Sequence, residues 1–160
     1  MRIYEINSDI LNNLDSASEE KQIAAVTDWA PNISYIQRPS EKVQLAAVQK
    51  SPDIISSIKN PSEKVQLAAI SKYVTSIVHI KYPTPKVQAT ALATYPAAIV
   101  APLNWTPSVI DKFKAPIITV ILNYMKHGHN DNARSMVKVL SDLGMRWPEI
   151  SVMQKSLAAS

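Results

Sequence analysis

Lysine is the residue type whose spacing in this sequence most clearly suggests a binding surface. Lysines recur at intervals of 22 residues in three columns, which are Lys42, Lys64 and Lys86; Lys50 and Lys72; and Lys59 and Lys81. If the segments that carry them fold alike and stack, equivalent positions align and each column becomes a ridge of positive charge. Such a ridge attracts phosphates or an acidic protein surface. The alternative is a solvated helix face, on which the adjacent Glu41 and Glu63 reduce the field.

The positive charge is concentrated in the middle of the chain. Residues 1–37 hold two basic and six acidic side chains, residues 38–126 hold eleven and four, and residues 127–160 hold four and three. Arg38 is the one arginine in the basic middle part, and arginine is the preferred reader of base edges and phosphates. Sequence-specific recognition of DNA is therefore not expected.

Glutamine recurs at the same interval as lysine, at Gln22, Gln44, Gln66 and Gln88. A buried side-chain amide both donates and accepts hydrogen bonds, and it must find partners for them. These glutamines could form a ligand-binding row. We expect instead that each one fixes a loop or a neighbouring helix end.

Aromatic residues supply candidate anchors for a partner. Trp29, Tyr73 and Tyr95 share one position of the 22-residue interval, and Ser51 fills it in the remaining copy. As a row they could stack nucleic-acid bases, but we expect them to pack at helix ends against the next unit. Trp147 is the predicted exposed aromatic anchor for a protein partner.

Catalytic and metal-binding patterns are poorly represented. The absence of cysteine excludes disulfides, thiolate metal sites and a cysteine nucleophile. The two glycines, Gly128 and Gly144, cannot form a phosphate-binding loop. His127 and His129 provide too few ligands for a closed zinc site, and we expect them at a helix end. We therefore predict no catalytic residue, metal or cofactor, and no enzyme activity.

A nearly literal repeat must position these side chains. The segment Pro39–Val48 (PSEKVQLAAV) returns as Pro61–Ile70 (PSEKVQLAAI), and Pro83–Leu92 is a looser copy. Counting back 22 residues finds a degenerate first copy, Ala17–Val26, and the residues from Thr106 keep only the opening of the motif. Four units and a fading fifth indicate a repeat architecture.

Each unit is predicted to form two short helices. The N-cap residues of the first helices are expected at Ser18, Ser40, Ser62 and Thr84. These helices should run to about residue 50 or 72 and break near a proline. The second helix carries isoleucines three residues apart, such as Ile55 and Ile58, which give one apolar stripe. So short a hairpin cannot bury its own faces, and neighbouring units must therefore stack.

Beyond residue 105 the pattern changes to longer helices. The first is predicted to start at Pro116 and stop at Gly128, and the second to start at Asn130 or Asp131 and stop at Gly144. The third is predicted to start at Pro148. The predicted fold class is all-α, an α-solenoid of short helical hairpins with a helical C-terminal cap. Residues 1–16 form the N-terminal cap, 17–105 the four repeats and 106–160 the C-terminal cap, in a single continuous domain.

The unit Pro39–Val48 resembles short αα repeats of bacterial and bacteriophage proteins of unassigned function and, more distantly, HEAT and armadillo repeats. The resemblance covers about residues 17–105. It implies an interaction surface, because related solenoids mostly bind proteins and some bind nucleic acid. HEAT units are nearly twice as long, so no particular HEAT partner carries over. The bacteriophage association implies a small protein that binds and inhibits host machinery in the host cytoplasm.

These observations lead to the expectation of a non-catalytic, cytoplasmic protein-interaction module. The lysine columns would steer an acidic partner, and aromatic anchors such as Trp147 would fix the contact. The alternative is a nonspecific nucleic-acid-binding protein that uses the same lysines on phosphates. Self-association through the ends of the array is a further alternative. No segment has the 18 or so consecutive apolar residues of a membrane helix, and no secretory signal is recognised, so no membrane contact is expected.

Overall fold

The computed structural model describes residues 13–160, in which every regular element is a helix and no strand occurs. Residues 1–12, which make up most of the predicted N-terminal cap, lie outside the described residues. Contacts divide the chain into two compact units, Met1–Lys81 and Tyr82–Ser160. The division falls between the third and fourth predicted repeats, and each unit is described by itself. Successive helices pack against their neighbours, so the predicted all-α, helical-repeat class of fold is confirmed.

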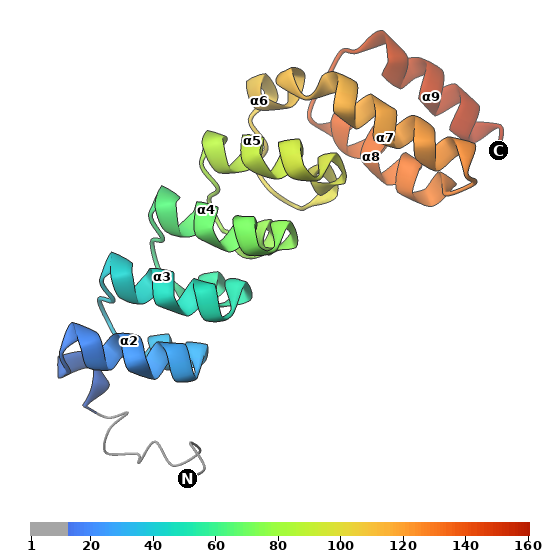
Figure 1. Ribbon diagram of the computed structural model, residues 1–160. Coiled ribbons are helices and arrows are strands. Elements are labelled where there is room, and N and C mark those ends of the chain that lie inside the picture. The colour runs from blue at the N-terminus through green and yellow to red at the C-terminus, as the bar shows by residue number, and fades with distance from the viewer. Residues whose placement is uncertain (1–12) are drawn as a thin grey trace. The chain divides into compact units, whose positions relative to one another are not determined.

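The first unit contains three repeats, each an α-helix of ten residues followed by a 3-10 helix of six residues. Its elements are η1 (Leu14–Ser16), α2 (Glu19–Asp28), η2 (Ala30–Tyr35), α3 (Glu41–Lys50), η3 (Pro52–Ser57), α4 (Glu63–Lys72) and η4 (Val74–His79). Helix α2 packs against α3, and α3 against α4. The 3-10 helices η2, η3 and η4 contact one another in the same order. Figure 1 shows α2, α3 and α4 side by side and running in the same direction.

The α-helices of the first unit begin at the predicted residues. The backbone N–H of Val43 donates to the hydroxyl of Ser40 at 3.4 Å, and Ser18 and Ser62 accept equivalent bonds. These bonds satisfy amides that a helix start leaves without a partner. Helices α3 and α4 end at Lys50 and Lys72, as predicted.

The second helix of each repeat is a 3-10 helix, which the sequence analysis did not anticipate. The residue between the two helices has extended backbone, with φ of −138°, −141° and −140° at Trp29, Ser51 and Tyr73. This extended residue separates the two helices. Both Ile55 in η3 and Ile58 directly after it are buried. A 3-10 helix has three residues per turn, so residues three apart share one face and the isoleucines form the predicted apolar stripe.

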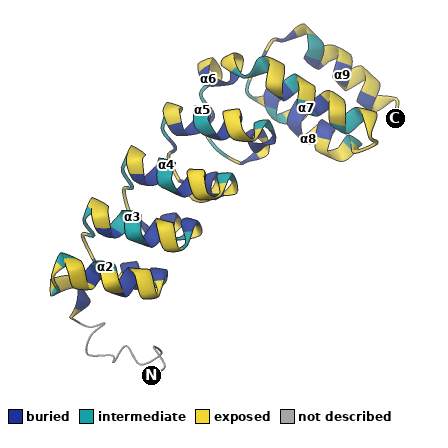
Figure 2. Cartoon of the chain, viewed as in Figure 1, coloured by how far each residue is buried: buried dark blue, intermediate teal, exposed yellow. Residues whose placement is uncertain are grey.

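Alanines lie where the α-helices of the first unit enter the core. Ala47 and Ala69 are fully buried, whereas the preceding Ala46 and Ala68 are half-buried. The second alanine of each pair therefore faces the core, while the first lies at its margin. Figure 2 shows buried and exposed residues alternating along each helix.

The second unit begins with the fourth repeat and continues into longer helices. Its elements are α5 (Pro85–Thr94), η5 (Pro96–Val100), α6 (Pro107–Lys112), α7 (Lys114–Lys126), α8 (Asn130–Asp142) and α9 (Pro148–Ala158). Thr84 caps α5 through its hydroxyl, as predicted. Helix α8 packs between α7 and α9, and it also contacts η5 together with α7.

The predicted stops of α7 and α8 are confirmed at Gly128 and Gly144, whose φ angles are 77° and 73°. In both cases the two amides after the helix bond back to its last turn, for example Gly144 N to Ser141 O and Met145 N to Leu140 O. This pattern is the Schellman motif, which requires a left-handed residue and so favours glycine.

Two of the three predicted helix starts in this unit were wrong. Helix α7 begins two residues before Pro116, because proline is tolerated anywhere in the first turn, where amides have no intrahelical acceptor. Asn130 is the first residue of α8 and does not cap it, since His129 occupies the N-cap position without a side-chain bond. Helix α9 begins at Pro148 as predicted.

Candidate binding surface

The first lysine column takes part in contacts between successive repeats of the first unit. Glu19 of one repeat accepts hydrogen bonds from Ser40 Oγ at 2.6 Å and from Lys42 Nζ at 3.1 Å of the next. Glu41 accepts equivalent bonds from Ser62 at 2.6 Å and Lys64 at 3.3 Å. Ser40 and Ser62 thus each accept a bond from their own helix and donate one to the preceding repeat.

These bonds stabilise the ionised carboxylates. The hydroxyl of Ser40, and then the ammonium of Lys42, hold the pKa of Glu19 below its ordinary value. Ser62 and Lys64 lower the pKa of Glu41 in the same way. Lys42 and Lys64 are exposed and ion-paired, so lysines and glutamates alternate along this column within the first unit.

Acid is expected to weaken the contacts between repeats. A carboxylate whose pKa is lowered in the folded state contributes stability above its unfolded pKa, and this contribution disappears as the pH falls through the folded value. The melting temperature should therefore fall as the pH drops below 4.5, the ordinary glutamate value. Thermal melts across this range should show a shallower fall for the double variant Glu19→Gln, Glu41→Gln.

The matched control for this acid effect is Asp28→Asn. Asp28 is exposed and makes no hydrogen bond or ion pair with any residue of 13–160. This variant should keep the full acid dependence of the parent chain. An unchanged acid slope in the double glutamine variant would contradict the proposed role of the two glutamates.

The remaining predicted lysines differ in how far they are engaged. Lys72 Nζ donates to the carbonyl oxygens of Gln49 and Lys50, the last residues of α3. Lys81 and Lys86 are exposed but are not free of interactions. Two of the seven predicted lysines, Lys50 and Lys59, are exposed, and their ammonium groups make no hydrogen bond or ion pair with residues 13–160.

The glutamines act as the sequence analysis expected, on loops and neighbouring segments. The side-chain amides of Gln44 and Gln66 donate to Pro39 O and Pro61 O, in the loops before their own helices. At the two ends of the series the glutamines reach further: Gln22 donates to η1, and Gln88 bonds to the segment 104–106. Their amides are used in the fold, which leaves no glutamine row for a ligand.

The aromatic residues at the shared repeat position are C-caps of the α-helices. Trp29 is 62% exposed and Tyr73 58% exposed, so most of each ring meets solvent. The expected packing against the next unit was wrong for these two residues. In the first unit, the extended backbone at the C-cap carries them out of the helix, and Ser51 takes their place in the middle repeat.

Trp147 is not the exposed anchor that the sequence analysis predicted. It is buried, with 8% of its surface exposed, and its indole N–H donates to Asp111 Oδ1 at 2.8 Å. Lys114 Nζ lies 5.8 Å from the centre of its ring and pairs with Glu149 at 3.1 Å. Trp147 therefore joins α6, α7 and α9 in the core of the second unit. The residues next to Trp147 in the sequence did not indicate that its partner would be Asp111.

Asp53, Ser76 and His79 lie together between η3 and η4. Ser76 Oγ donates to Asp53 Oδ1 at 3.1 Å, and His79 Nε2 lies 3.6 Å from the same oxygen. A nucleophilic triad requires the hydroxyl to bond to the imidazole, whereas here both groups face the carboxylate. The cluster therefore joins two successive repeats and is not a nucleophile–base pair.

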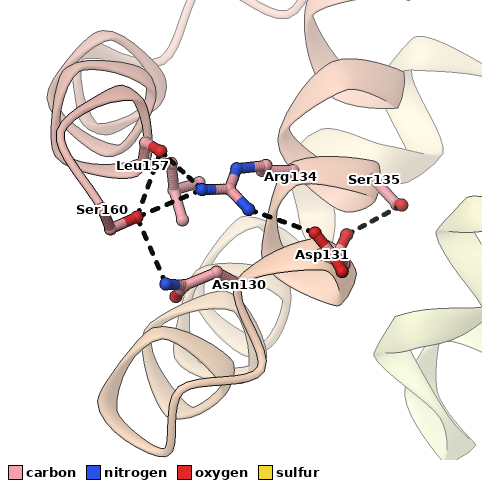
Figure 3. Close-up of polar contacts among 6 residues, drawn as sticks. All are labelled: Asn130, Asp131, Arg134, Ser135, Leu157 and Ser160. Atoms are coloured by element: carbon pink, nitrogen blue, oxygen red, sulfur yellow. Dashed lines mark hydrogen bonds and ion pairs between the residues drawn. The ribbon is translucent and has the colours of Figure 1, made fainter.

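A second polar cluster joins the end of α9 to the start of α8 (Figure 3). Arg134 donates to Leu157 O at 2.9 Å and to Ser160 Oγ at 3.2 Å, and it pairs with Asp131 at 3.1 Å. Asn130 also donates to Ser160 Oγ. A cation at the last carbonyls of a helix is favourable, so the cluster stabilises the helix end.

The fold and the surface together define a class of protein, an all-α protein built on short helical repeats. No protein-family model matches the sequence, and neither a curated protein nor a solved structure matches it. No three histidine or carboxylate side chains within residues 13–160 are grouped to hold a metal ion. Within the same residues, no helix has the length and apolar content needed to span a membrane.

Proposed function

We propose that the chain is a non-catalytic module that binds a protein partner. The observation that supports this most strongly is the exposure of Trp29 and Tyr73 at equivalent positions of the first unit. Tryptophan and tyrosine are enriched among the residues that dominate binding energy in protein interfaces. Two such residues, placed alike by the repeat, are typical of anchors for a partner.

The electrostatics of the first unit also favour a protein over nucleic acid. Nonspecific nucleic-acid binding requires several cations that are free to neutralise phosphates. Lys42 and Lys64 already pair with glutamates, and Lys72 lies on helix carbonyls. A phosphate backbone would have to compete with these partners, which lowers the gain from each contact.

An affinity experiment with two arms tests the function. The full chain is immobilised, a lysate of the source organism is applied, and retained proteins are identified and purified. We expect one of them to bind saturably to the full chain in isothermal titration calorimetry. We expect a random-sequence DNA duplex to pass through the same column in low salt.

The opposite result would favour the alternative function. Retention of the duplex, with log affinity falling steeply as log salt rises, would indicate a nonspecific nucleic-acid-binding protein. Failure of every retained protein to bind in purified form would contradict the proposal as well.

A further inference from the structure

We propose that the C-terminal ends of α2, α3 and α4 bind an acidic protein segment that carries an aromatic or aliphatic side chain beside its carboxylates. We call this surface the C-terminal edge, and it consists of Asp28, Trp29, Lys50, Ser51, Lys72 and Tyr73. This inference rests on the proposed function and adds to it the surface and the chemistry of the partner. The three helices run side by side in the same direction, so their ends lie along one side of the first unit (Figure 1).

The shape of the C-terminal edge suits a partner segment with apolar side chains. Trp29, Ser51 and Tyr73 have nearly the same φ and ψ, so their side chains leave the three repeats in equivalent ways. Packed helices lie about 8–10 Å apart. The two exposed rings therefore stand about 16–20 Å apart, on either side of the short Ser51 side chain. Each ring offers a separate contact to an apolar side chain of a partner segment that runs along the edge.

The charge of the C-terminal edge allows it to bind a carboxylate. Helix C-termini carry partial negative charge and by themselves repel an anion. Lys72 offsets the partial negative charge at the C-terminus of α3, because its ammonium donates to the last two carbonyls of that helix. The ammonium group of Lys50 is exposed and has no polar partner within residues 13–160, so it can pair with a carboxylate. Asp28 is the one acidic residue of the edge, which places the anion-binding part towards Tyr73.

The number of free cations on the edge favours a protein segment over a nucleic-acid strand. Stacking of bases on Trp29 and Tyr73 is chemically feasible. A nucleic-acid strand, however, presents a phosphate at every nucleotide, and Lys50 is the one lysine of the edge whose ammonium group has no polar partner in the described chain. A single free cation between aromatic rings suits one or two carboxylates next to an apolar side chain better than a run of phosphates.

Tryptophan fluorescence offers a local readout of the edge. Trp105 and Trp147 are 4% and 8% exposed, so quenching by acrylamide reports mainly on Trp29. The probe is a random copolymer of glutamate and tyrosine, titrated into the full chain. We expect it to shift the emission to shorter wavelength and to protect the tryptophan from acrylamide, and the variant Trp29→Phe should lose both signals. A copolymer of lysine and tyrosine should have no effect.

Matched variants locate the contact. Tyr73→Ala should weaken binding of the glutamate–tyrosine copolymer at least about tenfold. Its control is Tyr35→Ala, because Tyr35 is 51% exposed but lies at the end of η2. Lys50→Glu should weaken binding several-fold, and Lys59→Glu should not, although the ammonium group of Lys59 also has no polar partner among residues 13–160. Binding of the copolymer to the Lys50→Glu and Lys59→Glu variants is measured by the fluorescence of Trp29, which both variants keep.

Several outcomes would overturn the inference. One is the absence of copolymer binding, and another is binding that leaves Trp29 open to acrylamide or is equally weakened by Tyr35→Ala. Protection of Trp29 by single-stranded oligothymidylate, but not by the copolymer, would assign the edge to nucleic acid. If the partner isolated on the affinity column binds Tyr73→Ala and Lys50→Glu at parental affinity, the proposed function stands and the C-terminal edge is excluded as its site.

Discussion

Replacing Gln88 by leucine is expected to lower the free energy of unfolding by about 2–4 kcal/mol. Gln88 is 2% exposed, and its amide donates to Pro83 O at 3.3 Å and to Asn104 O at 3.0 Å. Its carbonyl oxygen accepts from the backbone N–H of Thr106 at 2.9 Å. Leucine fills a similar volume but leaves these three backbone groups without a partner. A buried group that loses its partner costs about 1–3 kcal/mol. Pro83 is buried, whereas Thr106 is half-buried and Asn104 is exposed, so water replaces part of the bonds that these two lose.

The same replacement at Gln44 is the internal control. Gln44 is half-buried, its amide donates to Pro39 O at 2.9 Å, and its carbonyl oxygen is buried without a hydrogen-bond partner among the described residues. Leucine loses one bond there but also removes the unsatisfied oxygen, so we expect a change within about 1 kcal/mol.

Urea denaturation measures both changes. The fluorescence of Trp105, which lies between the Gln88 partners Asn104 and Thr106, adds a local readout for the second unit. Equal losses for the two variants would show that the number of hydrogen-bond partners does not distinguish the two glutamines.

The repeat boundaries were predictable because they depend on local chemistry. A serine hydroxyl at the helix start and a proline shortly after the helix end act within a few positions of the chain. The near-identity of Pro39–Val48 and Pro61–Ile70 also supplied two independent views of the same helix. The ends of α3 and α4 follow directly from these signals.

The pairing of the lysines depends on contacts between repeats, which the sequence analysis did not examine. Glu41 and Lys42 are adjacent in sequence, and adjacent residues on a helix do not face each other. The actual partner of Lys42 is Glu19, 23 residues earlier. A search for opposite charges separated by about one repeat length would have found this pair and that of Lys64 with Glu41.

Trp147 illustrates a contact that no local pattern could have revealed. Its hydrogen-bond partner, Asp111, lies 36 residues earlier in the helix α6. Helix α6 itself lies in the fading fifth copy of the repeat, where the motif no longer predicts the packing. A large aromatic residue with a satisfied N–H is as compatible with a core as with an interface, and only the tertiary structure separates the two.

The spacing of the isoleucines contained more information than the sequence analysis used. Residues three apart lie on one face of a 3-10 helix, whereas in an α-helix they diverge by 60°. The repeated spacing at Ile33 and Ile36, Ile55 and Ile58, and Ile77 and Ile80 therefore favours a 3-10 helix. These short helices have little stability of their own, and their buried isoleucines must hold them against the α-helices.

Replacing Ile77 by alanine is consequently expected to lower the free energy of unfolding by about 2–5 kcal/mol. Ile77 is 1% exposed in η4, which packs against both α4 and η3. Removing most of its side chain loses buried apolar surface and leaves a cavity, because the surrounding helices relax only in part. The loss should be measured by urea denaturation at neutral pH, where the glutamate contacts are intact.

The neighbouring variant Val78→Ala is the matched control, since Val78 lies in the same 3-10 helix but is 48% exposed. We expect its unfolding free energy to stay within about 0.5 kcal/mol of the parent value. A large loss for Val78→Ala with a small one for Ile77→Ala would contradict the orientation of η4. Comparable losses would show that the 3-10 helices are held by their backbone and not by the isoleucine stripe. The expected difference between these adjacent residues thus tests the feature that most distinguishes this repeat from a pair of α-helices.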